Sequence, residues 1–140
     1  MSPEEQKRLM SRFIEEVWNK GNLDVADEIF DRQATSPSAP QLPPGPEGVK
    51  VIARMFRSAF PDFHMKIDDL IADGDMVVGR FTEGGTHSGT FMGIAPTGKK
   101  VEFTEIGILR LANGKVVESW YATDMLRLLQ TLGAVPPIGT

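Results

Sequence analysis

The chain has 140 residues, no cysteine and a formal net charge of −4, with acidic and basic residues interspersed. The absence of cysteine excludes disulfides, thiol catalysis and thiolate metal sites. Without a basic face, nucleic-acid binding is not expected, and no apolar run approaches the roughly 20 residues that a membrane span requires. Residues 1–7 are polar and acidic, unlike a signal peptide. We therefore expect one cytoplasmic domain over residues 1–140.

The first half of the chain has the patterns of three helices. Ser2 and Glu5 form a capping box, after which apolar residues recur at helical spacing up to Gly21. A second amphipathic segment covers residues 22–30, and a third covers residues 47–60. Three helices are therefore expected before any extended structure.

A proline-rich segment, residues 33–46, separates the second expected helix from the third. Five of the ten prolines of the chain lie in it: Pro37, Pro40, Pro43, Pro44 and Pro46. Such a segment is either a rigid connector or the rim or lid of a binding site.

The second half of the chain alternates between apolar and polar residues, which is typical of strands. The expected strands cover residues 63–72, 76–87, 101–111 and 116–123. Asn113-Gly114 is a strong hairpin signal, and a short final helix follows Asp124. Helices followed by antiparallel strands indicate an α+β fold, in which a strongly curved sheet wraps around three N-terminal helices as a cone with an apolar interior.

Several segments resemble one known family. The segment 85–99, GTHSGTFMGIAPTGK, resembles a signature of the SnoaL-like polyketide cyclases and ester cyclases, a branch of the NTF2-like superfamily. Residues 43–48, residues 60–62, and Trp120 followed by Asp124 agree with it. The resemblance implies a curved, mixed or antiparallel sheet, a ligand cavity in the cone and dimerisation through the sheet. It also implies aldol cyclisation of a polyketide without metal or organic cofactor, with Asp124 as acid/base.

Three positions depart from the pattern of that family. Many relatives carry an acidic residue directly after the tryptophan, where this chain has Tyr121. Cyclase members tend to have a histidine on the next-to-last strand, where this chain offers Glu105. Many also carry a histidine before the proline-rich segment, and residues 35–37 have none.

Two residues are the candidates for catalysis. Asp124 lies between aromatic and aliphatic residues, where lost hydration raises a carboxyl pKa and makes a better base; it can equally be the N-cap of the final helix. His87 can donate a hydrogen bond or shuttle a proton, or it can anchor the turn beside Gly85 and Gly89. His87 and His64 are too far apart in sequence to indicate a metal site.

The remaining candidates are expected to bind substrate. Glu105 and Glu83 each interrupt an apolar strand face, so each either lines a wet cavity, pairs with a base or faces a partner subunit. Tyr121 can bind an oxyanion, or it can pack on the sheet surface or at a dimer interface. Four other aromatic residues are assigned to the cavity wall, with ordinary core as the alternative for those on helices: Trp18, Phe56, Phe103 and Trp120.

Together these features favour a cofactor-independent enzyme acting on a hydrophobic, carbonyl-bearing small molecule. Asp124 would remove a proton α to a carbonyl, while His87 or Tyr121 stabilises the enolate. The alternatives are a non-catalytic binding module, or an isomerase, dehydratase or epoxide hydrolase of the same superfamily. The expected partners are the small molecule and a second copy of the chain, with no nucleic acid, membrane or metal.

Overall fold

The computed structural model describes residues 1–139, so the last residue of the expected domain span, Thr140, lies outside it. Its helical segments are α1 (Pro3–Arg12), a π-helical continuation (Phe13–Asn19), a 3₁₀ turn (Leu23–Val25), α2 (Ala26–Ile29), α3 (Pro46–Ala59) and α4 (Met125–Thr131). Its strands are β1 (Phe30–Thr35), β2 (His64–Asp73), β3 (Met76–Thr86), β4 (Lys100–Ala112) and β5 (Lys115–Thr123). The expected α+β class is confirmed.

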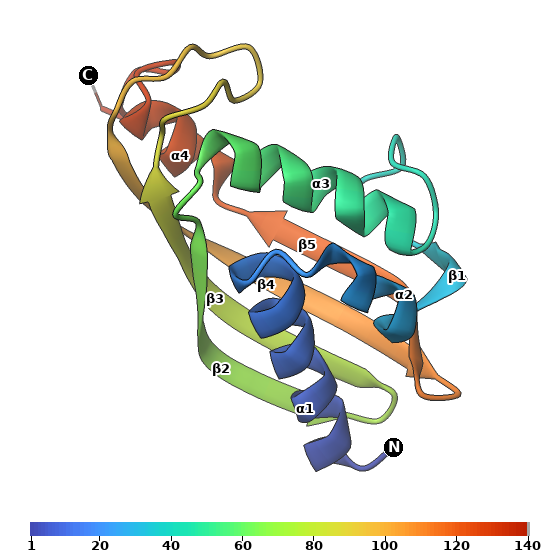
Figure 1. Ribbon diagram of the computed structural model, residues 1–140. Helices are drawn as coiled ribbons and strands as arrows, with labels where there is room; N and C mark the ends of the chain where they lie inside the picture. The colour runs from blue at the N-terminus through green and yellow to red at the C-terminus, as the bar shows by residue number, and fades with distance from the viewer. Residues whose placement is uncertain (140) are drawn as a thin grey trace.

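The strands form one mixed sheet in the order β1-β5-β4-β3-β2. Strand β1 runs parallel to β5, and the other neighbours are antiparallel. Figure 1 shows the sheet curving around α1 and α3, which lie against its concave face. Over the described strands the sheet does not close on itself. The expected curved sheet wrapped around the N-terminal helices is confirmed.

Local signals explain where most elements begin and end. The Ser2 hydroxyl accepts a hydrogen bond from the Glu5 backbone N–H at 3.1 Å, and the Glu5 carboxylate accepts one from the Ser2 N–H at 2.9 Å. Between β4 and β5, Asn113 and Gly114 have φ values of 52° and 77°. These positive values are what a two-residue hairpin turn requires, because its twist then matches that of the flanking strands.

Strand β1 departs from the expected pattern. The second helix was expected to reach residue 30 and to be followed by a loop, but α2 ends at Ile29 and an extended segment begins at Phe30. Phe30 and Ala34 are buried, with polar residues between them, so the segment has no regular alternation. Its pairing with β5, Phe30 opposite Val116, is a long-range contact that no local pattern reveals.

An aromatic cluster fills part of the concave interior. The Phe56 ring of α3 contacts five other rings at centroid distances of 5.2 to 6.5 Å: Trp18, Phe60, Phe63, Phe91 and Phe103. This cluster joins α3 to β4 and to the π-helical segment. Within residues 1–139, no helix is long and apolar enough to cross a membrane.

Candidate active site

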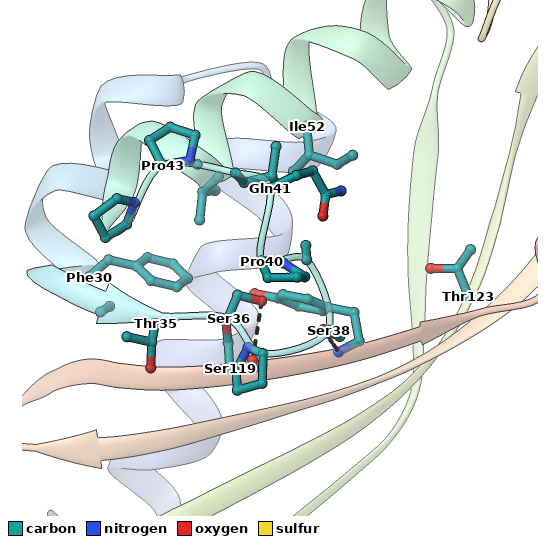
Figure 2. A pocket seen from close by; sticks show the side chains of 18 of the residues that line it. Phe30, Thr35, Ser36, Ser38, Pro40, Gln41, Pro43, Ile52, Ser119 and Thr123 are labelled. Carbon is teal, nitrogen blue, oxygen red and sulfur yellow. Dashed lines mark hydrogen bonds between the residues drawn. The ribbon is translucent and has the colours of Figure 1, made fainter.

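A pocket of about 610 Å³ opens beside the aromatic cluster on the concave side of the sheet. Its walls come from α3, the proline-rich segment and the inward faces of β1, β4 and β5 (Figure 2). Most of its lining is apolar, including Trp18 and Phe56. Volumes of this order, with a few polar groups on apolar walls, are typical of small-molecule sites. Trp18 and Phe56 therefore lie where the sequence placed them.

The proline-rich segment forms one wall of the pocket rather than only a connector. Residues 34–45 all line the pocket. The Ser36 hydroxyl donates to the Ser119 carbonyl of β5 at 3.2 Å, and the Tyr121 N–H donates to the Ser38 hydroxyl at 3.1 Å. Figure 2 shows both serines against β5. These bonds fix the segment along the part of β5 that extends beyond its pairing with β1.

Two buried glutamates lie together at the β3–β4 pairing. The register places Glu105 opposite Phe81 and Glu83 opposite Phe103, so the two acids are diagonal neighbours on the concave face. Glu105 lines the pocket and is 9% exposed, whereas Glu83 is 1% exposed and lies behind the lining. The two carboxyls are hydrogen-bonded to each other. The Thr123 hydroxyl of β5 donates to Glu105 Oε1 at 2.7 Å.

Burial shifts both carboxyl pKa values upward, because an apolar environment disfavours the charged form. Burial, the negative charge of Glu105 and the hydrogen bond between them raise the pKa of Glu83 to about 10. Burial also raises the pKa of Glu105, although the hydrogen bonds from Thr123 and Glu83 oppose that rise. The pKa of Glu105 therefore lies above that of an exposed glutamate, which makes its carboxylate a stronger base.

Tyr121 provides a phenol at the same pocket. Its ring is partly exposed, whereas its hydroxyl is buried beside the Ser119 side chain. Burial raises the pKa of this phenol, so it stays neutral and can donate. Of the two alternatives for Tyr121, the structure places it in the pocket and not on the outer face of the sheet.

Asp124 does not have the surroundings that the sequence led us to expect. Its side chain is exposed, lies outside the pocket lining, and accepts a hydrogen bond from the Arg127 N–H at 3.1 Å as the N-cap of α4. The expected desolvation of this acid is wrong, because β5 ends at Thr123 and the chain turns into α4 at the next residue. Its role as general base stays a prediction, without support from burial.

His87 is buried but also lies outside the pocket lining. Its Nδ1 accepts a hydrogen bond from the Thr97 N–H at 3.2 Å and lies 2.9 Å from the Thr97 hydroxyl. Its backbone N–H donates to the Lys99 carbonyl at 2.9 Å, and its ring packs on Phe60 at 5.5 Å. Through these contacts His87 anchors the connection between β3 and β4, outside the pocket, and its catalytic role stays a prediction.

Two of the aromatic candidates also lie elsewhere. Phe103 is buried behind Phe56, with ring centroids 6.2 Å apart, and does not line the pocket. Trp120 lies on the opposite face of β5 from Tyr121, where the Arg110 guanidinium lies 5.7 Å from its ring centroid. Alternation along β5 places only one of two consecutive residues inward, which excludes Trp120 from the pocket.

Sequence reasoning missed three parts of the site. Thr123 lies two residues after Tyr121 on the same strand face, so alternation was a sufficient signal for it. The pairing of Glu83 with Glu105 had no such signal, because the β3–β4 register depends on a long connection over residues 87–99. The serines of the proline-rich segment had no periodic pattern at all. Among residues 1–139, no group of three or more His, Asp or Glu side chains is arranged to hold a metal ion.

Comparisons with known proteins agree with this architecture. The family model of the SnoaL-like polyketide cyclases matches residues 8–132. The aklanonic acid methyl ester cyclase DnrD of Streptomyces peucetius is 25% identical over 129 residues, which are 89% of this chain and 88% of DnrD. Among solved structures, TsrD of Streptomyces laurentii superimposes with a TM-score of 0.89 at 27% identity, covering 96% of this chain and 99% of TsrD.

A second solved structure, AclR of Streptomyces galilaeus, has a TM-score of 0.86 at 32% identity, covering 96% of this chain and all of AclR (100%). The sequence match and the structural matches thus extend over nearly the whole chain and share one α+β, NTF2-like fold. The chain belongs to the SnoaL-like polyketide cyclase family.

Proposed function

We propose that this protein is a cofactor-independent enzyme that enolises and cyclises a hydrophobic, carbonyl-bearing small molecule, with Glu105 as general base. The observation that carries the proposal is the composition of one pocket wall: a buried carboxyl at Glu105 beside a buried, neutral phenol at Tyr121. Membership of a family of polyketide cyclases supports the reaction class.

The reaction needs two groups and a shaped cavity. The Glu105 carboxylate takes a proton from a carbon α to a carbonyl, while the Tyr121 hydroxyl donates a hydrogen bond to the enolate oxygen. The enolate carbon then forms a bond to a second carbonyl carbon of the same molecule, and the new alkoxide takes the proton back from Glu105. A general base typically accelerates such a reaction by about 10²–10⁴-fold. Holding the two reacting carbons together can lower the activation barrier by roughly 7–11 kcal/mol.

The base is assigned to Glu105 and not to Asp124, because the base must reach the α proton of a substrate that lies inside the pocket. Glu105 lines the pocket at 9% exposure, whereas Asp124 is exposed and occupied as the α4 cap. In this proposal Asp124 is the aspartate that matches the family pattern, but Glu105 is the residue that acts as the base.

The pocket favours an uncharged substrate. Among the described residues that line it, none is Lys, Arg or His, and Glu105 contributes negative charge. A free carboxylate in the substrate would meet repulsion without a compensating cation, so an ester form is preferred. The relative DnrD is a cyclase of aklanonic acid methyl ester, which is such a form.

Turnover of aklanonic acid methyl ester tests the assignment of the base. Ring closure leaves the mass unchanged, so product is followed as an isomer by liquid chromatography with mass detection. Glu105→Gln is expected to lose at least about 10² in kcat, whereas Asp124→Asn keeps it, because asparagine caps a helix as well as aspartate. Loss of kcat in Asp124→Asn with full activity in Glu105→Gln would reverse the assignment.

A non-catalytic binding module is the second candidate function. The observation in its favour is that Asp124 and His87 both lie outside the pocket, which leaves a largely apolar cavity. Tight binding of the same ester without turnover by the wild-type protein would support it. An epoxide hydrolase needs an arginine at the site, but Arg80 and Arg110 form ion pairs with Asp69 and Asp75, away from the pocket lining.

We also propose that two copies associate through the convex face of the sheet. The strand register places four apolar residues in one row across β2 to β5: Ile71, Val78, Ile108 and Trp120. Ile71 is 62% exposed, and Ile106 on the same face of β4 is 49% exposed. A second copy placed on this face would cover apolar area that is otherwise in water.

A further inference from the structure

Glu83 does not line the pocket, yet it is among the most deeply buried polar residues of the described chain. Its side chain is 1% exposed, and its Oε2 has no hydrogen-bond partner in the described structure. The Glu83 carboxyl is hydrogen-bonded to the carboxyl of Glu105, which lines the pocket. An ionised carboxylate in that position would be uncompensated, which makes its protonation state the main question.

We propose that Glu83 and Glu105 share one proton at neutral pH, that this proton resides on Glu83, and that Glu83 donates it in a hydrogen bond to the Glu105 carboxylate. Glu83 is thus a positioning residue: it holds Glu105 in its basic form and fixes its orientation. The catalytic consequence rests on the function proposed above, whereas the shared proton does not.

The asymmetry between the two carboxyls decides where the proton resides. Glu105 Oε1 already accepts a hydrogen bond from the Thr123 hydroxyl at 2.7 Å, which stabilises negative charge there. Glu83 has no comparable donor, because its free oxygen is buried without a partner. Two adjoining carboxyls in an apolar site cannot both ionise, so the one with fewer donors keeps its proton. The raised pKa of Glu83 agrees with a proton that resides on Glu83.

The other ionisable groups near the interior do not supply a compensating positive charge. Tyr121 on β5 is a neutral phenol, and the Nδ1 of His87, in the connection after β3, accepts a hydrogen bond from the Thr97 N–H. On α3, Arg57 donates to the carbonyls of Trp18 and Asn19. The buried cation of α3, Lys50, pairs with three acids at 2.9 to 3.4 Å: Asp24, Asp27 and Glu47. The buried side chains that β2, α4 and the π-helical segment contribute to the interior are apolar: Met65, Leu128, Phe13, Ile14, Val17 and Trp18.

A neutral donor at Glu83 changes the pH range in which Glu105 works. Without it, burial alone would hold Glu105 protonated to a higher pH. With it, the carboxylate form of Glu105 is favoured by two hydrogen bonds, from Thr123 and from Glu83. The acid limb of the pH–rate profile therefore depends on a residue that does not contact the substrate.

Infrared spectroscopy tests the shared proton without any substrate. The wild-type protein at pH 7 is expected to show the C=O stretch of a protonated carboxyl, and Glu83→Gln is expected to lose it. Glu102→Gln, which changes an exposed acid on the other face of β4, is the matched control and should keep the band. A wild-type spectrum without this band, or a band that persists in Glu83→Gln, overturns the proposal.

The pH profile of kcat/KM for aklanonic acid methyl ester tests the positioning role. Glu83→Gln retains a donor and should keep the acid limb of the wild type. Glu83→Met fills the same space without a donor, so its acid limb should move up by about one pH unit, an about tenfold loss along that limb that recovers at higher pH. An equal loss at every pH in Glu83→Met, or an unmoved limb, contradicts the positioning role, and melting temperatures show whether the variants are folded. Absence of turnover in the wild type would refute the proposed function for this ester and leave the infrared result to decide the shared proton.

Discussion

Replacing Glu83 with glutamine is expected to remove a pH dependence from the stability of the fold. Burial raises the pKa of Glu83 to about 10 in the folded protein, while an unfolded glutamate titrates at about 4.3. Between these values the folded chain binds a proton that the unfolded chain has released. The contribution of this group is therefore fully present below the unfolded pKa and is lost as the pH rises towards the folded pKa.

The magnitude follows from the number of protons rather than from the size of the pKa shift. When the folded state binds one more proton than the unfolded state, the free energy of unfolding falls by about 1.36 kcal/mol for each unit by which the pH rises. From about pH 5.5 to about pH 7.5 the wild type should thus lose about 2.7 kcal/mol through Glu83. Glutamine has no proton to release, so the stability of Glu83→Gln relative to the wild type should rise by that amount over the same interval.

Urea unfolding at three pH values in this interval measures the effect, with Glu102→Gln as the control. The control alters an exposed glutamate of β4, so its pH dependence should follow that of the wild type. Parallel stability curves for the wild type and Glu83→Gln would mean that Glu83 is ionised in the folded protein, and the reasoning about the buried pair would be refuted.

Three other substitutions have defined outcomes. Tyr121→Phe removes a buried hydroxyl beside the Ser119 side chain, so the melting temperature should stay near that of the wild type while kcat for aklanonic acid methyl ester falls about tenfold or more. Equal kcat would exclude the phenol from the reaction. Gly48→Ala places a Cβ against the carbonyl oxygen of Pro43, so the proline-rich wall of the pocket must move. Calorimetry should therefore show weaker binding of the ester to Gly48→Ala than to the control Val51→Ala, which changes an exposed residue of α3. Ile108→Glu puts a charge in the apolar row of the convex face, and light scattering should show monomers in place of dimers; dimers that persist would exclude this face.

Most strands could be predicted from the sequence because their signals are local. The alternation in β4, for example, places Val101, Phe103 and Glu105 on one face, and the structure buries all three. The Asn113-Gly114 turn fixes the first pairs of β4 and β5 through its own geometry, and a bulge between Arg110 and Leu111 then shifts the register. Strand β1 could not be found, because its stability comes from pairing with β5 and not from its own residues.

Some residues of the site could likewise be predicted from local patterns, and others could not. Alternation in β4 places Glu105 on the inward face, and it lines the pocket. Tyr121 also lines the pocket, but the buried Val116 lies five residues before it, so alternation along β5 is broken by the bulge in its pairing with β4. The last residue before a helix is different: Asp124 follows an inward-facing strand residue, but the first turn of α4 takes its side chain as a cap. The contact between Glu83 and Glu105 depends on a strand register that is set across a long connection, so no local pattern contained it.

Deuterium incorporation into aklanonic acid methyl ester in D₂O tests most directly whether a pocket acid enolises a bound carbonyl compound. The wild-type protein should accelerate exchange at the carbon α to the carbonyl over buffer alone, and Asp124→Asn should do so equally. Glu105→Gln should return the rate to that of buffer. Exchange that survives in Glu105→Gln but disappears in Asp124→Asn would contradict the assignment of the base to the buried acid of β4.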